Sequence, residues 1–153
     1  MKKPYLIFLT ILTVLFSSCQ IDRSGLPKTI NNSNLYGTWY LKTELIAGSS
    51  AGTAPTSYVL HNFNQNDFYK FNTDYTLNFS SSSPPIAYTT YYTFLTTDNG
   101  QTLNIGSGPG KHTGAAYIVN KLTRDSLILF NAVTANDVSG VIYTTNTTLM
   151  FAH

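Results

Sequence analysis

The chain has 153 residues, with 9 Lys and Arg against 7 Asp and Glu and a formal net charge of +2. Two of the basic residues, Lys2 and Lys3, lie at the start, so the rest of the chain is close to neutral and has no basic stripe for binding nucleic acid. The single cysteine, Cys19, excludes an internal disulfide, and the fold must therefore rely on its apolar core.

The first 18 residues have the layout of an export signal. Two lysines precede residues 5–16, which are almost entirely apolar. This run is shorter than the roughly 20 apolar residues that a membrane-spanning helix needs. We therefore expect residues 1–18 to be a signal peptide.

The signal runs directly into Ser17, Ser18 and Cys19. This arrangement resembles the lipobox of bacterial lipoproteins, in which the signal is cut before a cysteine that carries fatty acyl chains. The resemblance implies lipidation of Cys19 and a protein anchored in the cell envelope, and Gln20 resembles the pattern sorted to the outer membrane. The alternative is a free thiol at the end of an uncleaved membrane helix.

Residues 19–34 are rich in Gly, Pro, Ser and Asn and are expected to form a lipidated, flexible tether. Residues 35–153 then leave about 120 residues, enough for one domain with its own core. This part is rich in Thr, Tyr, Phe, Asn and Ser, and no stretch has a sustained helical period. The composition predicts an all-β domain.

The first strand is expected at residues 36–46, where apolar and polar residues alternate. The alternation places Trp39, Leu41, Thr43 and Leu45 on one face and Thr38, Tyr40, Lys42 and Glu44 on the other.

Further strands follow in meander order. The pattern predicts strands at 56–63, at 67–71 and 75–80 joined by a turn at 72–74, at 87–95 and 101–106 joined at 97–100, at 115–123 and 126–133 joined at 124–125, and at 141–151. Eight or nine antiparallel strands in this order most simply close into an up-and-down barrel, because closure removes the exposed edges.

Gly37, Thr38 and Trp39 on the first strand resemble the G-x-W signature of lipocalins. The resemblance implies an eight-stranded lipocalin-like barrel, with Trp39 plugging its closed end, and a cup for a small hydrophobic ligand. Lipocalins also stack an arginine of the last strand on this tryptophan. Neither Lys nor Arg follows Arg124 here, so this chain departs from the family at that position.

A ligand in a hollow barrel would contact the side chains that alternation turns inward. The candidates are Trp39, Leu41, Tyr75, Leu77, Phe79, Leu103 and Ile105. Because several are bulky, a filled barrel is an equal alternative. The protein would then be a non-catalytic accessory lipoprotein that binds a protein partner or a glycan through exposed Tyr88, Tyr91 and Tyr92.

No catalytic, metal or cofactor site is predicted. Residues 48–52 formally match G-x-S-x-G, which would make Ser50 the nucleophile of an envelope hydrolase, but that motif needs a strand-to-helix turn. The histidines His61, His112 and His153 lack metal-ligand spacing and are expected on the surface or in loops.

Three loops resemble binding or modification motifs, and each has a simpler interpretation. Residues 106–113 only approximate a phosphate loop, and residues 62–67 resemble a calcium loop with a single carboxylate. Ser126, between Asp125 and Leu127, is similar to an O-glycosylation acceptor, although a tight turn is favoured.

Overall fold

The computed structural model describes residues 33–50, 53–106, 114–136, 138 and 140–153. This part of the chain forms nine β-strands and contains no helix, which confirms the all-β prediction. The strands are β1 (Gly37–Ser50), β2 (Thr56–Leu60), β3 (Phe68–Phe71), β4 (Thr76–Ser82), β5 (Pro85–Thr97), β6 (Gly100–Ile105), β7 (Ala115–Leu122), β8 (Leu127–Asn136) and β9 (Ile142–Ala152). Over the same residues, no helix is long and apolar enough to cross a membrane.

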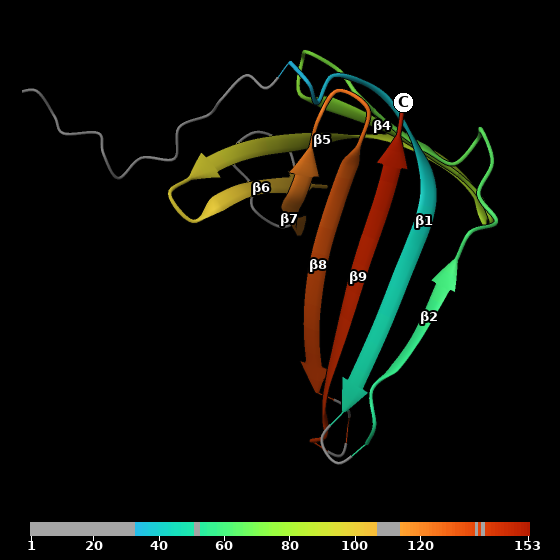
Figure 1. The fold of residues 1–153 in the computed structure, drawn as a ribbon, viewed down its shortest axis with the longest axis vertical. Coiled ribbons are helices and arrows are strands. Elements are labelled where there is room, and N and C mark those ends of the chain that lie inside the picture. Colours follow the sequence, from blue (N-terminus) through green and yellow to red (C-terminus); the bar gives the residue numbers. More distant parts are fainter. Residues whose placement is uncertain (1–32, 51–52, 107–113, 137, 139) are drawn as a thin grey trace, which may run out of the picture.

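Eight of the strands close into an antiparallel barrel. Neighbours pair in the order β1, β3, β4, β5, β6, β7, β8 and β9, and β9 pairs back with β1. The remaining strand, β2, pairs with Glu44–Gly48 of β1 and extends the wall beside it (Figure 1). The predicted up-and-down barrel of eight strands, with a possible ninth, is therefore confirmed.

The three predicted hairpins are also present, as β3–β4, β5–β6 and β7–β8. In the first turn, the Asp74 carboxylate accepts hydrogen bonds from the Thr76 backbone N–H (3.0 Å) and hydroxyl (2.6 Å). The turn places Tyr75 at a φ of +64°, so β4 begins one residue later than predicted. The prediction that Tyr75 alternates inward with Leu77 and Phe79 is wrong, because its side chain is 44% exposed at the turn.

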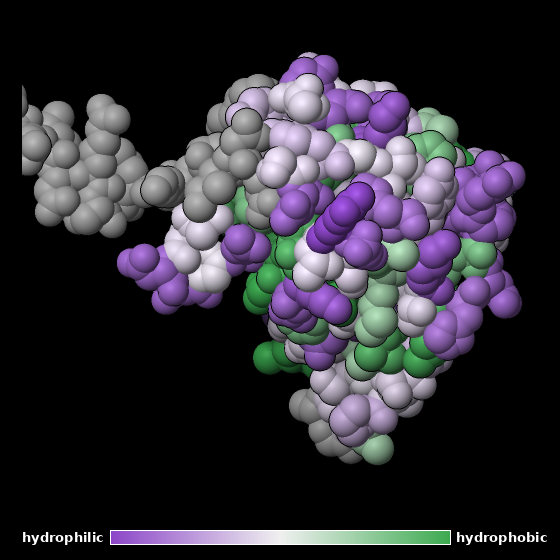
Figure 2. All heavy atoms as spheres, turned by 45° about the horizontal axis from the view of Figure 1, so that its top comes forward, coloured by the Kyte–Doolittle hydropathy of each residue, from purple (hydrophilic) through white to green (hydrophobic). Residues whose placement is uncertain are grey.

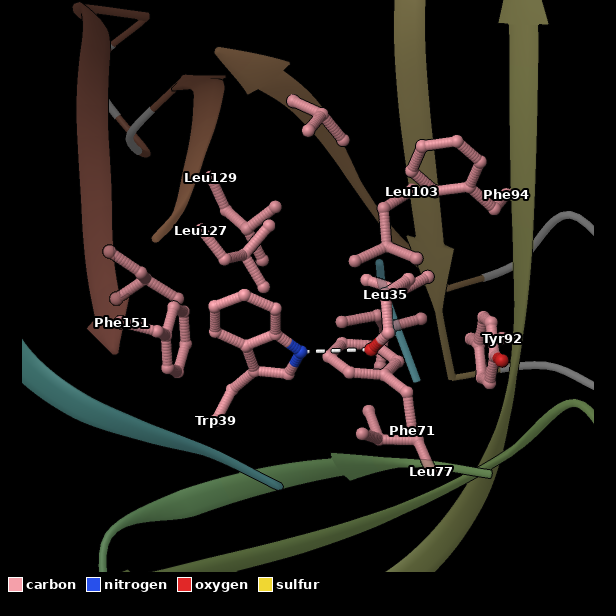
Figure 3. Packing of buried hydrophobic residues seen from close by; sticks show 13 residues of the cluster. Leu35, Trp39, Phe71, Leu77, Tyr92, Phe94, Leu103, Leu127, Leu129 and Phe151 are labelled. Carbon is pink, nitrogen blue, oxygen red and sulfur yellow. Dashed lines mark hydrogen bonds between the residues drawn. The ribbon is translucent and has the colours of Figure 1, made fainter. Parts of the chain in front are cut away.

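One end of the barrel is filled by apolar side chains. This closed end is mostly hydrophilic or neutral on its outside, whereas hydrophobic patches lie on the flank below it (Figure 2). Inside, Trp39 is completely buried beside Leu127, Leu129 and Phe151, and its indole N–H donates to the Leu35 carbonyl at 2.8 Å (Figure 3). The tryptophan therefore plugs the closed end, where the resemblance to lipocalins places it.

Trp39 also has an aromatic partner that the sequence analysis missed. The imidazole of His153, the residue after β9, lies 3.9 Å from the indole between ring centroids, tilted by 35°. His153 Nδ1 lies 2.9 Å from the Thr38 carbonyl oxygen, which fixes the ring in place. The sequence analysis looked only for the arginine of the family and so missed this stacking partner.

Gly37 is the residue that allows this contact. Its φ of +124° is unfavourable for any residue with a side chain, and a Cβ atom at this position would lie 2.9 Å from His153 Cε1. Gly100 has almost the same φ, +122°, but nothing lies within 4 Å of its Cβ position. Comparing substitutions at the two glycines therefore separates the cost of backbone strain from the cost of the contact with His153.

We predict that Gly37→Ala lowers the free energy of unfolding by about 1–3 kcal/mol, and by more than Gly100→Ala does. In a His153→Ala background, the loss at Gly37 should shrink to that of Gly100→Ala, because only the strain remains. Urea denaturation of the single and double variants measures these differences. Equal losses at the two glycines in the parent protein would contradict the proposed role of Gly37.

Candidate functional site in the open half of the barrel

A β-bulge in β1 sets the chemistry of the open half. Leu41 pairs with Phe151 and Thr43 with Met150, so Lys42 is an extra residue with no partner on β9. Since one extra residue reverses every later side chain, the alternation predicted beyond Leu41 is wrong. Glu44, opposite the buried Leu149, faces inward instead of outward.

The residues predicted inward after Leu41 face outward instead. The Thr43 hydroxyl lies 3.3 Å from His61 Nδ1, on the exposed side of β1 and β2. Leu45, which pairs with Val59 of β2 and Thr148 of β9, lies on the same outer side by alternation. The inner wall beyond the bulge is consequently less apolar than predicted.

Beyond the bulge the barrel encloses a cavity of about 330 Å³. Its lining comes from β1, β3, β4, β7, β8 and β9, from the loop between β2 and β3 and from the turn between β4 and β5. Ser80, Ser81, Asn131 and Thr147 add polar atoms to the apolar surface of Leu41 and Leu149. The cavity is therefore amphipathic rather than purely hydrophobic.

Aromatic rings form one wall of the cavity. The ring centroids of Tyr69 and Phe79 are 5.2 Å apart, and those of Phe79 and Tyr88 are 4.9 Å apart. Tyr69 also lies 4.9 Å from Phe151 of the core. This chain of rings crosses β3, β4 and β5 and continues from the buried core to the exposed Tyr88.

The floor of the cavity is a pair of tyrosines from opposite sides of the barrel. Tyr69 on β3 and Tyr117 on β7 are hydrogen-bonded through their hydroxyls. Both pack against the core cluster and both line the cavity. The barrel is therefore filled between this pair and the closed end, and hollow between this pair and the open end. The filled-barrel and hollow-barrel interpretations of the sequence each describe one half.

The seven ligand-lining candidates divide along the same boundary. Leu41 and Phe79 line the cavity. Four others lie in the buried core of the closed half, namely Trp39, Leu77, Leu103 and Ile105. Tyr75 belongs to neither group, because it lies in the β3–β4 turn.

Sequence reasoning missed Glu44, Tyr69 and Tyr117 as lining residues. Tyr69 could have been found, because it lies two residues before the apolar Phe71 in the strand predicted at 67–71 and so shares its face. Glu44 could not have been found, because the alternation of apolar and polar residues does not reveal the bulge that turns it inward. Its discovery depends on the β1–β9 register.

Glu44 places a carboxyl group in the cavity. It is half-buried, and this burial raises the pKa of its carboxyl above the ordinary value. Within the described residues, the carboxylate has no hydrogen-bond or ion-pair partner. Burial first, and then Tyr117, Tyr88 and Glu44, raise the pKa of the Tyr69 hydroxyl, so the four polar groups share one environment.

A second carboxylate of the cavity, that of Asp67, is already hydrogen-bonded within the protein. Asp67 is 4% exposed and accepts hydrogen bonds from the Asn64 backbone N–H (2.8 Å) and from the backbone N–H (2.6 Å) and hydroxyl (2.8 Å) of Ser82. Its burial opposes ionisation, but these bonds outweigh it and lower the pKa of Asp67. The backbone carbonyl of Asp67 accepts a hydrogen bond from the Leu41 N–H at 2.9 Å. Asp67 therefore links β1, beside the bulge, to Ser82 at the end of β4.

We predict that Asp67→Asn lowers the free energy of unfolding by about 1–3 kcal/mol, because an amide can accept at only one of the two positions that now receive donors. The stability that Asp67 contributes is present above pH 3.8 and is lost as the pH falls through its lowered folded pKa. Thermal unfolding between pH 2 and pH 7 measures both effects. An unchanged stability profile, equal to that of the exposed Asp125→Asn control, would contradict this role.

The other motifs have structural roles where they are described. Gly48, Ser49 and Ser50 pair with β9 inside β1, and the Ser50 hydroxyl lies 2.6 Å from that of Thr53, whereas residues 51 and 52 of the motif lie outside the described residues. In residues 62–67, the Asn66 N–H donates to the Asn64 side chain in a local turn. The described residues contain no group of three or more His, Cys, Asp and Glu side chains that could hold a metal.

Ser126 lies in the turn between β7 and β8. Its N–H donates to the Thr123 hydroxyl at 3.1 Å, and its carbonyl accepts from the Thr123 N–H at 2.9 Å, as in the favoured tight turn. Cys19, His112 and residues 107–113 lie outside the described residues.

The three tyrosines proposed for partner binding do not form one surface. Tyr88 and Tyr91 are exposed, but Tyr92 is only 2% exposed, and its hydroxyl donates to the Asn72 carbonyl at 2.8 Å. The prediction of an exposed Tyr92 is wrong, because adjacent residues of a strand point to opposite faces. Tyr88, opposite Phe79, lies on the inner side, which leaves Tyr91 alone on the outer side.

No protein-family model matches the chain, and neither a curated protein nor a solved structure does.

Proposed function

We propose that the protein is a lipid-anchored envelope protein whose barrel binds a small molecule in the cavity at its open end. The observation that carries this proposal is the cavity itself. Its volume of about 330 Å³ falls at the lower end of the roughly 300–1,000 Å³ typical of small-molecule sites. A filled barrel would leave no such space above the Tyr69–Tyr117 floor.

The mouth of the cavity supports the same function. Alternation from the lining residues places several exposed apolar side chains on the inner side of the rim, each 42–54% exposed: Tyr58, Leu60, Ile86, Tyr88, Val133 and Tyr143. An apolar rim of this kind favours a ligand with an apolar body, because entry removes both surfaces from water.

We predict that Thr147→Trp weakens binding of N-phenyl-1-naphthylamine, an uncharged apolar dye at neutral pH, at least tenfold. Thr147 lines the cavity, so an indole there would occupy the space of the ligand. The matched control is Thr148→Trp, since Thr148 lies opposite Phe130 and Leu45 on the outer side, and this variant should bind within twofold of the parent. Dye fluorescence is measured on residues 33–153, after circular dichroism and thermal unfolding show that each variant folds.

No dye uptake by the parent protein, or equal uptake by the two tryptophan variants, would contradict binding in the cavity.

The lipid anchor is supported by the sequence alone. Two lysines, the apolar run of residues 5–16, two serines and Cys19 follow one another in the order of a lipoprotein signal. Several acyl chains, each contributing about 0.8 kcal/mol per buried methylene, would hold the protein firmly at a membrane. The envelope location, the outer membrane and the absence of enzymatic activity stay predictions.

We predict that cells expressing the full-length protein incorporate labelled palmitate into it, and that Cys19→Ser abolishes the label and releases the protein from the membrane fraction. The control is Ser24→Cys in the Cys19→Ser background, which restores a thiol outside the motif and should stay unlabelled. Label that persists in Cys19→Ser, or its absence from the parent, would refute lipidation of Cys19.

A further inference from the structure

The cavity has an excess of negative charge. Among the residues that the structure describes, its lining contains two carboxylates, Glu44 and Asp67, and no Lys, Arg or His side chain. Asp67 is saturated by donors from Asn64 and Ser82. Glu44 therefore presents the one carboxylate of this lining that is free to pair with a ligand.

Leaving Glu44 without a partner is unfavourable for the empty protein. A half-buried carboxylate has lost part of its hydration, and the described residues supply no cation to replace it. An uncharged ligand without a hydrogen-bond donor would remove more of this hydration and return nothing, and a neutral donor would return less than a charged one. An anionic ligand would also be repelled, whereas a cationic group would restore the missing partner.

The rings that line the cavity together with Glu44 favour the same charge. Tyr69 and Phe79 are in contact with each other, Tyr88 continues this chain of rings beyond the lining, and Tyr117 is paired with Tyr69 at the cavity floor. The face of an aromatic ring carries negative electrostatic potential and attracts an ammonium group within about 6 Å. The rings also provide apolar area for the remainder of a ligand.

We propose that the cavity selects small organic cations, namely amines or ammonium compounds with an apolar body, with Glu44 as the counter-ion and the rings of Tyr69, Phe79 and Tyr117, which line the same cavity, beside the charge. This inference rests on the proposed ligand-binding function and specifies its ligand class. The apolar body lies toward the rim, where Ile86 and Val133 are exposed.

The test compares three probes that share a phenyl ring and differ in charge. The full-length protein, purified in a nonionic maltoside detergent, is titrated in a calorimeter with 2-phenylethylamine, 2-phenylethanol and 3-phenylpropionate at neutral pH. The amine should bind at least about tenfold more tightly than the alcohol, and the carboxylate should bind most weakly. Detergent without protein provides the blank.

The variant Glu44→Gln keeps the size of the side chain and removes its charge. It should lose the tenfold preference for the amine while its affinity for the alcohol stays within twofold. The control Asp98→Asn removes a carboxylate from the exposed β5–β6 turn, outside the cavity, and should bind all three probes as the parent does. Matching unfolding temperatures show that the variants are folded.

Equal binding of amine and alcohol by the parent, or a preference that survives in Glu44→Gln, would overturn the proposal. If none of the three probes binds but the uncharged dye is taken up in a manner blocked by Thr147→Trp, the cation selectivity fails and the binding function stands. If neither the dye nor any probe binds, the binding function itself fails.

Discussion

The pairing of β1 with β9 is the constraint on which the rest of the structure depends. It joins the first and last barrel strands, so that neither presents an open edge along the paired segment. At its start it brings Trp39 against His153, and a few residues further along it sets Glu44 opposite Leu149. The position of Trp39 at the closed end and the inward Glu44 of the cavity are both consequences of the β1–β9 pairing.

The bulge at Lys42 divides the interior into two chemical environments. Before it, β1 contributes Trp39 and Leu41 to an apolar core, and after it the same strand contributes a carboxylate. On the opposite edge of β1, the hydrogen bond from the Leu41 N–H to the Asp67 carbonyl continues the pairing with β3 beside the bulge. A single inserted residue thereby allows a protein with a fully apolar closed end to hold a charged group in its open half.

The sequence predicted the barrel well because its signals are local. Alternation identified the strands, and Asn72–Asp74, Asp98–Gly100 and Arg124–Asp125 marked turns that the structure confirms. The resemblance to lipocalins correctly placed Trp39 at the closed end. These features depend on residues close together in the chain.

The errors concern features that depend on contacts between distant residues or on a change of backbone conformation. The inward Glu44 follows from the register of β1 against β9, and the stacking of His153 joins the two ends of the domain. Tyr75 left the inner face because the Asp74 turn placed it at positive φ. Strict alternation cannot represent any of these three events, and the first of them determines the chemistry of the site.

Nuclear Overhauser contacts of the Glu44 side chain test the central claim most directly. The structure predicts contacts from the Glu44 methylenes to Leu149 and to the rings of Tyr69 and Tyr117, together with contacts between Thr43 and His61 on the outer side. Contacts from Thr43 to those rings, with Glu44 beside His61 instead, would show an unbroken β1 strand and would contradict the account of the cavity.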